Sequence, residues 1–153
     1  MTESKKIFVL DLFFLKVFEI DDFNLFRITI TILTKIDMVC HKILLSKSLT
    51  NLYKQYLKRF KKITYYDRSH KSYLSFLNNF LRNSEKIENV NEVDVKVEAS
   101  EDDLPIIKTA CARPYSIIIT ADVKNFKENK EIQRILRERN VKVWNLDEAI
   151  ENI

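Results

Sequence analysis

The chain of 153 residues is 46% hydrophobic and 31% charged, and it carries a formal net charge of +4. This composition is typical of one globular domain with its own core and excludes a disordered chain. The absence of glycine excludes a nucleotide site built on a glycine-rich loop. No apolar run approaches the roughly 20 residues of a membrane span, and the first residues lack a secretory-signal pattern, so we expect a cytoplasmic protein without membrane contact.

The first third of the chain predicts a buried strand and a long helix. Residues 6–10 form a short apolar run, typical of a buried strand, that ends at Asp11. Residues 13–18 are also apolar and fit either a strand or a helix. From Asp22, a candidate N-cap, apolar residues recur at helical spacing, although the β-branched residues 28–32 favour a strand.

The middle of the chain again predicts a strand followed by helices. Residues 42–46 predict a second strand, and Ser46 or Ser48 can cap the helix that follows. Another helical pattern covers residues 69–81. Within the polar stretch 88–100, three valines alternate with other residues and could form a strand: Val93, Val95 and Val97.

The last third predicts alternating helices and strands. Pro105 suits the first turn of a helix that starts at Asp103. An apolar strand follows at residues 116–120, and the pattern then predicts a helix at 128–139, a strand at 141–144 and a helix at 146–150. Asn140 is expected to end the first of these two helices in the left-handed conformation, where many chains use glycine.

This alternation predicts an α/β fold with three layers, α/β/α, around a central, mostly parallel sheet. We expect a single domain over residues 1–153, because residues 84–100 have the composition of a loop inside one domain. The many phenylalanines before residue 30 exceed what one amphipathic helix buries. They suit a packed core, and an oligomer interface is the alternative.

Basic residues and tyrosines are interleaved between residues 54 and 71. Four of the cations lie close together: Lys58, Arg59, Lys61 and Lys62. Cations attract phosphates and aromatic rings stack on bases, so this segment predicts binding to single-stranded RNA. The alternative is an amphipathic helix with a solvated basic face and tyrosines partly in the core.

Aspartates follow two predicted strands and begin a predicted helix: Asp11, Asp122, and Asp103 with Asp102 beside it. At the carboxyl edge of a parallel sheet, where ligands bind, these carboxylates would repel one another unless a cation neutralised them. The pattern therefore predicts a Mg²⁺ or Mn²⁺ site, with Thr120 bonded to a carboxylate or a metal-bound water. The alternative is that the aspartates cap helices and turns, which explains Asp11 least well because it ends an apolar strand.

In their order and spacing, these residues resemble the PIN domain family, metal-dependent ribonucleases that include many prokaryotic toxins. Asp11 ends the first strand, as in the family. Asp103 opens a helix seven residues before Ala110, and Thr120-Ala-Asp122 matches the family's Thr-x-Asp. The resemblance covers nearly the whole chain and is best from residue 101 to residue 126.

The chain also departs from the family pattern. Leu12 and Phe13 follow the first aspartate, where the family usually has a small polar pair. Leu52 stands where the family usually carries a Glu, and Asn125 where it often has another Asp. Removal of a ligand charge weakens cation binding, so Leu52 favours a site that has lost catalysis.

The resemblance implies catalytic and metal-binding roles for Asp11, Asp103 and Asp122. It also implies a metal-binding role for Asp102 and supporting roles for Thr120 and Asn125. The expected activity is Mg²⁺- or Mn²⁺-dependent hydrolysis of single-stranded RNA by a toxin of a toxin–antitoxin pair, with an antitoxin-like protein and a homodimer as expected partners. The alternatives are a degenerate domain that binds RNA or a protein without cutting, and an unrelated Rossmann-like interaction domain whose acids are caps.

Overall fold

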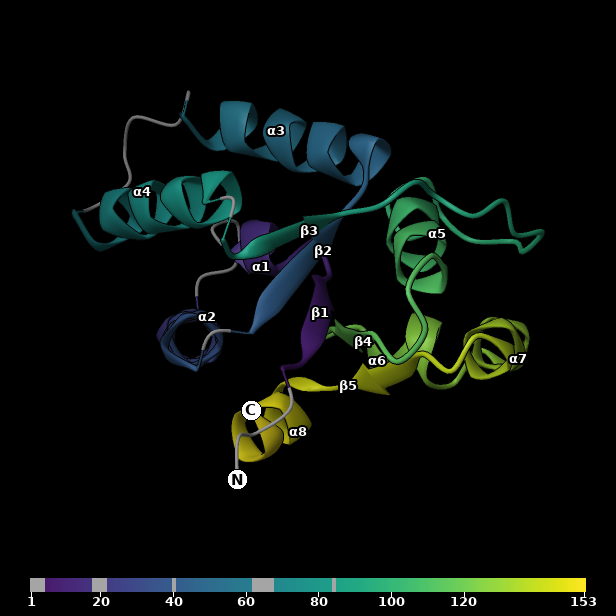
Figure 1. The fold of residues 1–153 in the computed structure, drawn as a ribbon. Helices are drawn as coiled ribbons and strands as arrows, with labels where there is room; N and C mark the ends of the chain where they lie inside the picture. The colour runs from purple at the N-terminus through teal and green to yellow at the C-terminus, as the bar shows by residue number, and fades with distance from the viewer. Residues whose placement is uncertain (1–4, 18–21, 40, 62–67, 84) are drawn as a thin grey trace.

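The protein is described from a computed structural model, which covers residues 5–17, 22–39, 41–61, 68–83 and 85–153. Within these residues, five parallel strands form one sheet in the order β3-β2-β1-β4-β5 (Figure 1). The strands are β1 (Ile7–Leu10), β2 (Lys42–Leu45), β3 (Ile87–Asn89), β4 (Ile117–Ile119) and β5 (Lys142–Trp144). The predicted α/β class is confirmed, and the sheet is parallel throughout, where the sequence predicted it to be mostly so.

The central strands are buried on both faces, which explains their unbroken apolar sequences. Phe8 in β1 pairs in register with Ile43 in β2 and with Ile117 in β4, and Val9, Ile43 and Ile118 are fully buried. Because all strands run the same way, their carboxyl ends meet at one edge of the sheet. β1 lies in the middle of that edge.

Helices cover both faces of the sheet. In Figure 1, α5 (Leu104–Cys111) and α7 (Lys130–Glu138) lie on one side, and α2 (Phe23–Met38) and α8 (Leu146–Asn152) lie on the other. α3 (Lys47–Lys61) lies against α5, and α4 (Arg68–Arg82) lies beside α2, where the rings of Phe26 and Tyr73 are 5.2 Å apart. The described residues also form two short helices, α1 (Phe13–Lys16) and α6 (Val123–Phe126).

Two segments that the sequence left open are helical. Residues 13–16 form α1, which begins two residues after Asp11. Residues 28–32 lie inside α2, where Ile32 and Leu33 are buried on its inner face. The threonine hydroxyls of that stretch donate to carbonyl oxygens one turn earlier, so the β-branched residues are accommodated in a helix.

The predicted strand at Val93, Val95 and Val97 is wrong, because residues 90–100 have no regular structure. The last ladder bond of β3 joins the Val90 N–H to the Leu45 carbonyl at 2.8 Å. Beyond it the chain leaves the sheet, and the Glu92 carboxylate accepts hydrogen bonds from the Ser46 hydroxyl and the Ser48 N–H. These polar contacts attach the segment to the start of α3 instead of extending the sheet.

The local signals in the last third of the chain are confirmed. Pro105 lies in the first turn of α5, and Asn140 follows α7 with a φ of 58°. Tyr115 also has a positive φ, 67°, and its N–H donates to the Asn140 carbonyl at 2.9 Å. Non-glycine residues therefore occupy two left-handed positions in a chain without glycine. None of the helices in the described ranges combines the length and the apolar character that crossing a bilayer requires.

Candidate functional site

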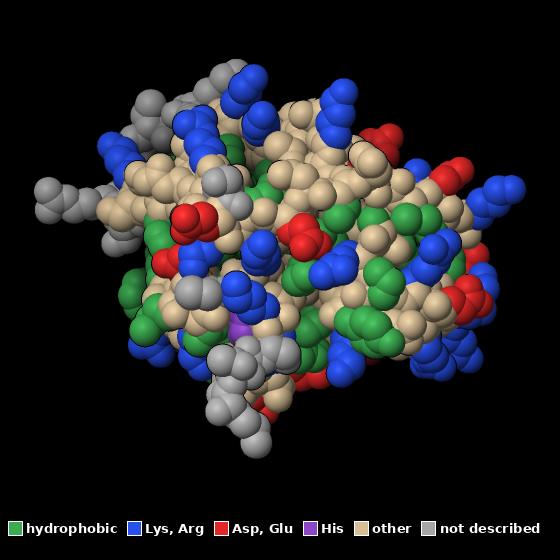
Figure 2. All heavy atoms as spheres, in the orientation of Figure 1, with side chains coloured by type: hydrophobic (Ala, Val, Ile, Leu, Met, Phe, Trp, Pro, Cys, Tyr) green, Lys and Arg blue, Asp and Glu red, His purple; other side chains and the backbone are tan. Residues whose placement is uncertain are grey.

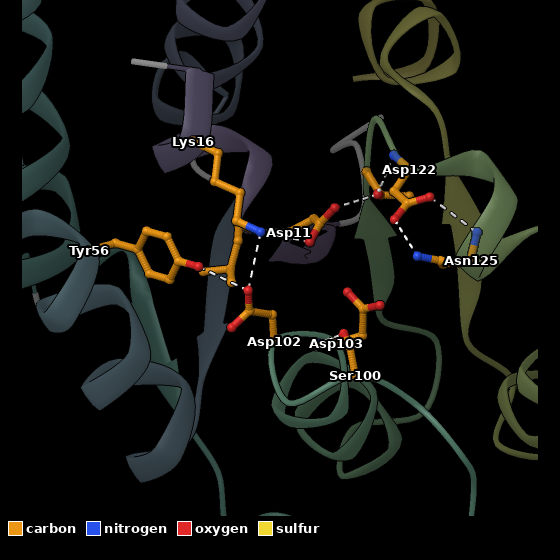
Figure 3. A network of polar contacts seen from close by, with 10 residues as sticks. Asp11, Lys16, Tyr56, Ser100, Asp102, Asp103, Asp122 and Asn125 are labelled. Atoms are coloured by element: carbon orange, nitrogen blue, oxygen red, sulfur yellow. Dashed lines mark hydrogen bonds and ion pairs between the residues drawn. The ribbon is translucent and has the colours of Figure 1, made fainter. Parts of the chain in front are cut away.

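A cleft of about 370 Å³ lies at the carboxyl edge of β1 and β4. Its lining includes the four aspartates singled out in the sequence: Asp11, Asp102, Asp103 and Asp122. The remaining lining residues are Leu12, Phe13, Lys16 and Ala121. Figure 3 shows the four carboxylates arriving from the end of β1, the start of α5 and the loop after β4. The sequence therefore identified residues that the fold brings together.

A slightly larger hollow, of about 420 Å³, lies between α7 and β5. Its lining carries Lys127, Arg137 and Lys142 together with apolar residues, and no carboxylate, histidine or cysteine. This hollow therefore lacks the carboxylate, imidazole and thiolate groups that usually bind metal ions in proteins. The acidic cleft is the better candidate for a functional site.

Asp11 is the most buried of the four aspartates, with 6% of its surface exposed. Its N–H donates to the Ile119 carbonyl at 3.0 Å, which fixes its backbone to the end of β4. One carboxylate oxygen accepts from the Leu12 N–H at 2.7 Å and the other from the Thr120 hydroxyl at 2.5 Å. The carboxylate is therefore held in one orientation, and a capping role does not account for it.

The surroundings of Asp11 favour its protonated form. Burial raises the pKa of Asp11 from 3.8 to about 6, and the charges on Asp103 and Asp122 add to this effect. The hydrogen bonds from Thr120 and Leu12 act in the opposite direction but do not cancel it. In the absence of a cation, the ionised form of Asp11 is therefore less stable than that of an ordinary aspartate and predominates only above about pH 6.

Asp103 stands at the start of α5 but makes no side-chain capping bond with the helix. The Ser100 hydroxyl accepts from the Asp103 N–H at 3.1 Å, and the Ser100 carbonyl accepts from the Leu104 N–H at 3.0 Å. Burial raises the pKa of Asp103, the Ser100 hydroxyl opposes this rise, and the charge of Asp122 adds to it. The capping alternative is therefore wrong for Asp103, whose carboxylate lines the cleft.

Asp122 caps the short helix α6, so the alternative interpretation of the aspartates as capping residues is correct for Asp122. Its carboxylate accepts from the Asn125 N–H at 3.1 Å and from the Asn125 side-chain amide at 2.7 Å (Figure 3). The Asp122 N–H donates to the Thr120 hydroxyl at 2.8 Å. Thr120, fully buried, thus connects Asp122 with Asp11. Thr120 bonds a carboxylate, as the sequence suggested, and Asn125 contacts the predicted site.

Asp102 is engaged by two residues that the sequence did not single out for the site. One of its oxygens accepts from the Lys16 ammonium at 3.1 Å and from the Tyr56 hydroxyl at 2.9 Å (Figure 3). Burial lowers the pKa of Lys16, but the hydrogen bond and the charge of Asp102 outweigh it, so the pKa lies above its ordinary value of 10.5. Had residues 13–18 been assigned to a helix, Lys16 would have fallen about one turn beyond Asp11.

The predicted RNA-binding cations are only partly described. Lys58 and Arg59 are exposed on α3, whereas the side chain of Lys61 and the whole of Lys62 lie outside the described residues. Figure 2 shows Lys and Arg side chains along the top of the view, over α3. Tyr53 is buried and its hydroxyl donates to the Leu10 carbonyl, so the core interpretation is correct for this tyrosine.

The cleft lacks the glutamate that the resemblance implies on α3. Leu52 is partly buried against the core and is absent from the lining of the cleft. Among the residues that the structure describes, no three His, Cys, Asp or Glu side chains are arranged as a ready-made metal site. The aspartates thus share a cleft without forming a closed cage.

Comparisons of the chain with protein-family models, with curated proteins and with solved structures find no match.

Proposed function

We propose that this protein is a metal-dependent ribonuclease with a PIN-like site, which hydrolyses phosphodiesters of single-stranded RNA. Asp11, Asp103 and Asp122 would hold Mg²⁺ or Mn²⁺. Asp11 carries the proposal: it is a buried carboxylate, fixed by two hydrogen bonds, and two further carboxylates destabilise its charge. Native structures rarely keep such a group unless a cation or a reaction requires it.

The chemistry of the donors fits this assignment. Mg²⁺ and Mn²⁺ prefer oxygen ligands, and Mg²⁺ commonly uses one or two carboxylates, with water and phosphate completing its coordination. Each Asp11 oxygen accepts one hydrogen bond in the described structure and has further lone-pair capacity. Asp102 fits less well than the sequence suggested, because one of its oxygens already accepts from Lys16 and Tyr56.

A bound divalent cation would supply an activated water and neutralise charge that develops on the phosphate. The chain's own residues would hold the ligands in place. Thr120 orients the Asp11 carboxylate, and Asn125 orients that of Asp122. Leu12 and Phe13, where the family has polar residues, line the cleft and reduce access of bulk water to Asp11.

The test is cleavage of single-stranded RNA by the purified chain in Mn²⁺ or Mg²⁺, compared with EDTA. Asp11→Asn and Asp122→Asn are expected to abolish cutting while the fold is retained. Asp147→Asn is the matched control, because Asp147 is exposed on α8 and is not among the residues that line the cleft. Cutting that survives in EDTA, or in either cleft variant, would contradict the proposal.

A second candidate is a binding module that no longer cuts RNA. Two observations favour it: Leu52 packs against the core where an acid was expected, and Asp102 is occupied by Lys16 and Tyr56. A folded, metal-saturated protein that binds RNA without cutting it would establish this alternative. The antitoxin-like partner, the toxin role and the homodimer stay predictions from the resemblance.

A further inference from the structure

Lys16 is the only cation among the described residues that line the acidic cleft. It is the last residue of α1, five positions after Asp11. Its charge interacts with those of Asp11, Asp102 and Asp103. A phosphate that approaches this cleft meets four carboxylates, so the position of the single ammonium decides where an anion can bind.

The contacts of Lys16 leave it able to change partners. Its ammonium lies 3.1 Å from Asp102 and 5.6 Å from the centre of the Tyr56 ring. The Lys16 and Asp102 side chains are 41% and 34% exposed, and ion pairs this accessible to water contribute little. A phosphate can therefore replace Asp102 at the ammonium at low cost, whereas the ring and the helix keep Lys16 at the cleft.

Tyr56 also connects the cleft with the basic surface of α3. The guanidinium of Arg59 lies 6.0 Å from the centre of the same ring. Arg59 and Lys58 are exposed on α3. Lys16, which contacts the same Tyr56 ring as Arg59, lines the cleft. Positive charge thus extends from the helix surface to the carboxylates, along a line that a flexible single strand can follow.

We propose that Lys16 is the residue that binds a phosphate of single-stranded polynucleotide at the cleft, in exchange for its ion pair with Asp102. The choice of polynucleotide as the ligand rests on the proposed function. Lys16 would position the strand beside Asp11, Asp103 and Asp122, and Asp102 would hold the ammonium in place until the strand arrives. Lys16 lies outside the segment that the sequence assigned to RNA binding, whereas Tyr56 is one of the tyrosines within that segment.

The experiment measures binding of a fluorescent oligouridylate to the full chain by anisotropy, in EDTA, between about 50 and about 200 mM NaCl. Lys16→Met is expected to weaken binding about fivefold at low salt and to reduce the slope of log K against log salt by about 0.7, the value for one phosphate contact on a single strand. Lys16→Arg should keep the slope of the unmodified chain. Lys130→Met, which removes the same charge from an exposed position on α7, should leave the slope unchanged.

Asp102→Asn provides a second, independent readout. Loss of its charge frees Lys16, so binding should tighten several-fold in the unmodified chain and clearly less in the Lys16→Met background. Equal effects in both backgrounds would show that Asp102 does not act through Lys16 and would overturn the proposal. Equal slopes for Lys16→Met and Lys130→Met would overturn it as well.

Inorganic phosphate serves as the probe for the other source of this chemistry. Binding of phosphate without binding of the oligouridylate would overturn the polynucleotide assignment. Because EDTA prevents metal-dependent cutting, these measurements do not depend on catalysis. A chain that binds through Lys16 but never cuts RNA would support the phosphate site and refute the nuclease.

Discussion

The Thr120 hydroxyl donates a hydrogen bond to the Asp11 carboxylate at 2.5 Å, although the two residues are 109 positions apart in the sequence. The same hydroxyl accepts from the Asp122 N–H at 2.8 Å. Asp11 follows β1 and Thr120 follows β4, and these strands are neighbours in the sheet. One buried hydroxyl therefore sets the relative position of two carboxylates that the proposed reaction needs.

Thr120→Val tests this relationship, because valine keeps the shape of threonine and removes the hydroxyl. The variant leaves one oxygen of the buried Asp11 carboxylate and the Asp122 N–H without the partner that the hydroxyl supplied, so we expect a loss of about 1–3 kcal/mol in the free energy of unfolding. The loss should be greater at pH 8 than at about pH 4, where Asp11 is protonated in the native state. Urea unfolding at both values measures it.

Thr120→Ser is the control, since serine keeps the hydroxyl and loses only a methyl group. It should preserve most of the pH-dependent part of the stability. If Thr120→Val and Thr120→Ser lose stability equally at both pH values, the hydrogen bond to Asp11 has no energetic role.

The raised pKa of Asp11 predicts the direction of a pH effect on the metal-free protein. Between its unfolded pKa of 3.8 and its folded pKa of about 6, the native state binds the proton more tightly than the unfolded state. Stability contributed by this group is therefore fully present below the unfolded value and is lost as pH rises through about 6. The change corresponds to about 3 kcal/mol at most, at 1.36 kcal/mol per pKa unit.

Other acids also titrate in this range, so the measurement is a difference. Urea unfolding in EDTA, from about pH 4 to about pH 8, is compared between the unmodified chain and Asp11→Asn. We expect the unmodified chain to lose stability relative to the variant as pH rises, with no further change above about pH 7. A difference that stays constant across this range would show that the carboxylate is not destabilised by burial.

Addition of Mn²⁺ is expected to stabilise the protein. A ligand that binds only the native state stabilises it by about 3 kcal/mol at a hundred times its Kd. The melting temperature should therefore rise with Mn²⁺ concentration for the unmodified chain and for Asp147→Asn. The rise should be lost or much smaller in Asp103→Asn, and an undiminished rise in that variant would place the metal elsewhere.

Glu92 is expected to control the order of the segment that leads to Asp102 and Asp103. Its carboxylate accepts from the Ser46 hydroxyl and from the Ser48 N–H at the start of α3. Glu92→Ala removes these acceptors, so amide hydrogen exchange should become faster at Ser48 and across residues 90–100. Stability should fall by about 1–2 kcal/mol, the effect of losing a helix cap.

Asp94→Ala is the matched control for Glu92. Asp94 lies in the same segment with its side chain 92% exposed, at 3.9 Å from Lys108. The Asp94→Ala substitution should change amide hydrogen exchange only at residues close to position 94. If the two variants give the same exchange pattern, Glu92 does not attach the segment to α3.

Much of the fold could be predicted because local pattern and tertiary environment agree in this chain. The apolar residues before Asp11 and before Thr120 are buried on both faces of the sheet, as strands of that composition require. The convergence of Asp11 and Asp122 followed from topology, since parallel strands end at one edge, and Asp103 begins the helix that leads back into β4. The order of strands and helices along the chain was therefore enough to predict that these aspartates lie close together.

The remaining features depended on contacts that no local pattern reveals. The valines at 93, 95 and 97 alternate as a strand would, but polar contacts of Glu92 with α3 direct that segment away from the sheet. The place of Lys16 at the cleft could not be predicted, because the pattern of residues 13–18 fits a strand and a helix equally well. Its role at the cleft also depends on Asp102 and Tyr56, which are 86 and 40 positions further along the chain.

The position of β4 beside β1 has a consequence during synthesis on the ribosome. Asp11 is synthesised 109 positions before its partner Thr120, and the nearby Asp122 follows Thr120. Because β4 must dock across a long sequence separation, the cleft is assembled late in folding. A nascent or truncated chain that lacks β4 therefore carries Asp11 without the partners that complete the cleft, and we expect it to have no activity of the cleft.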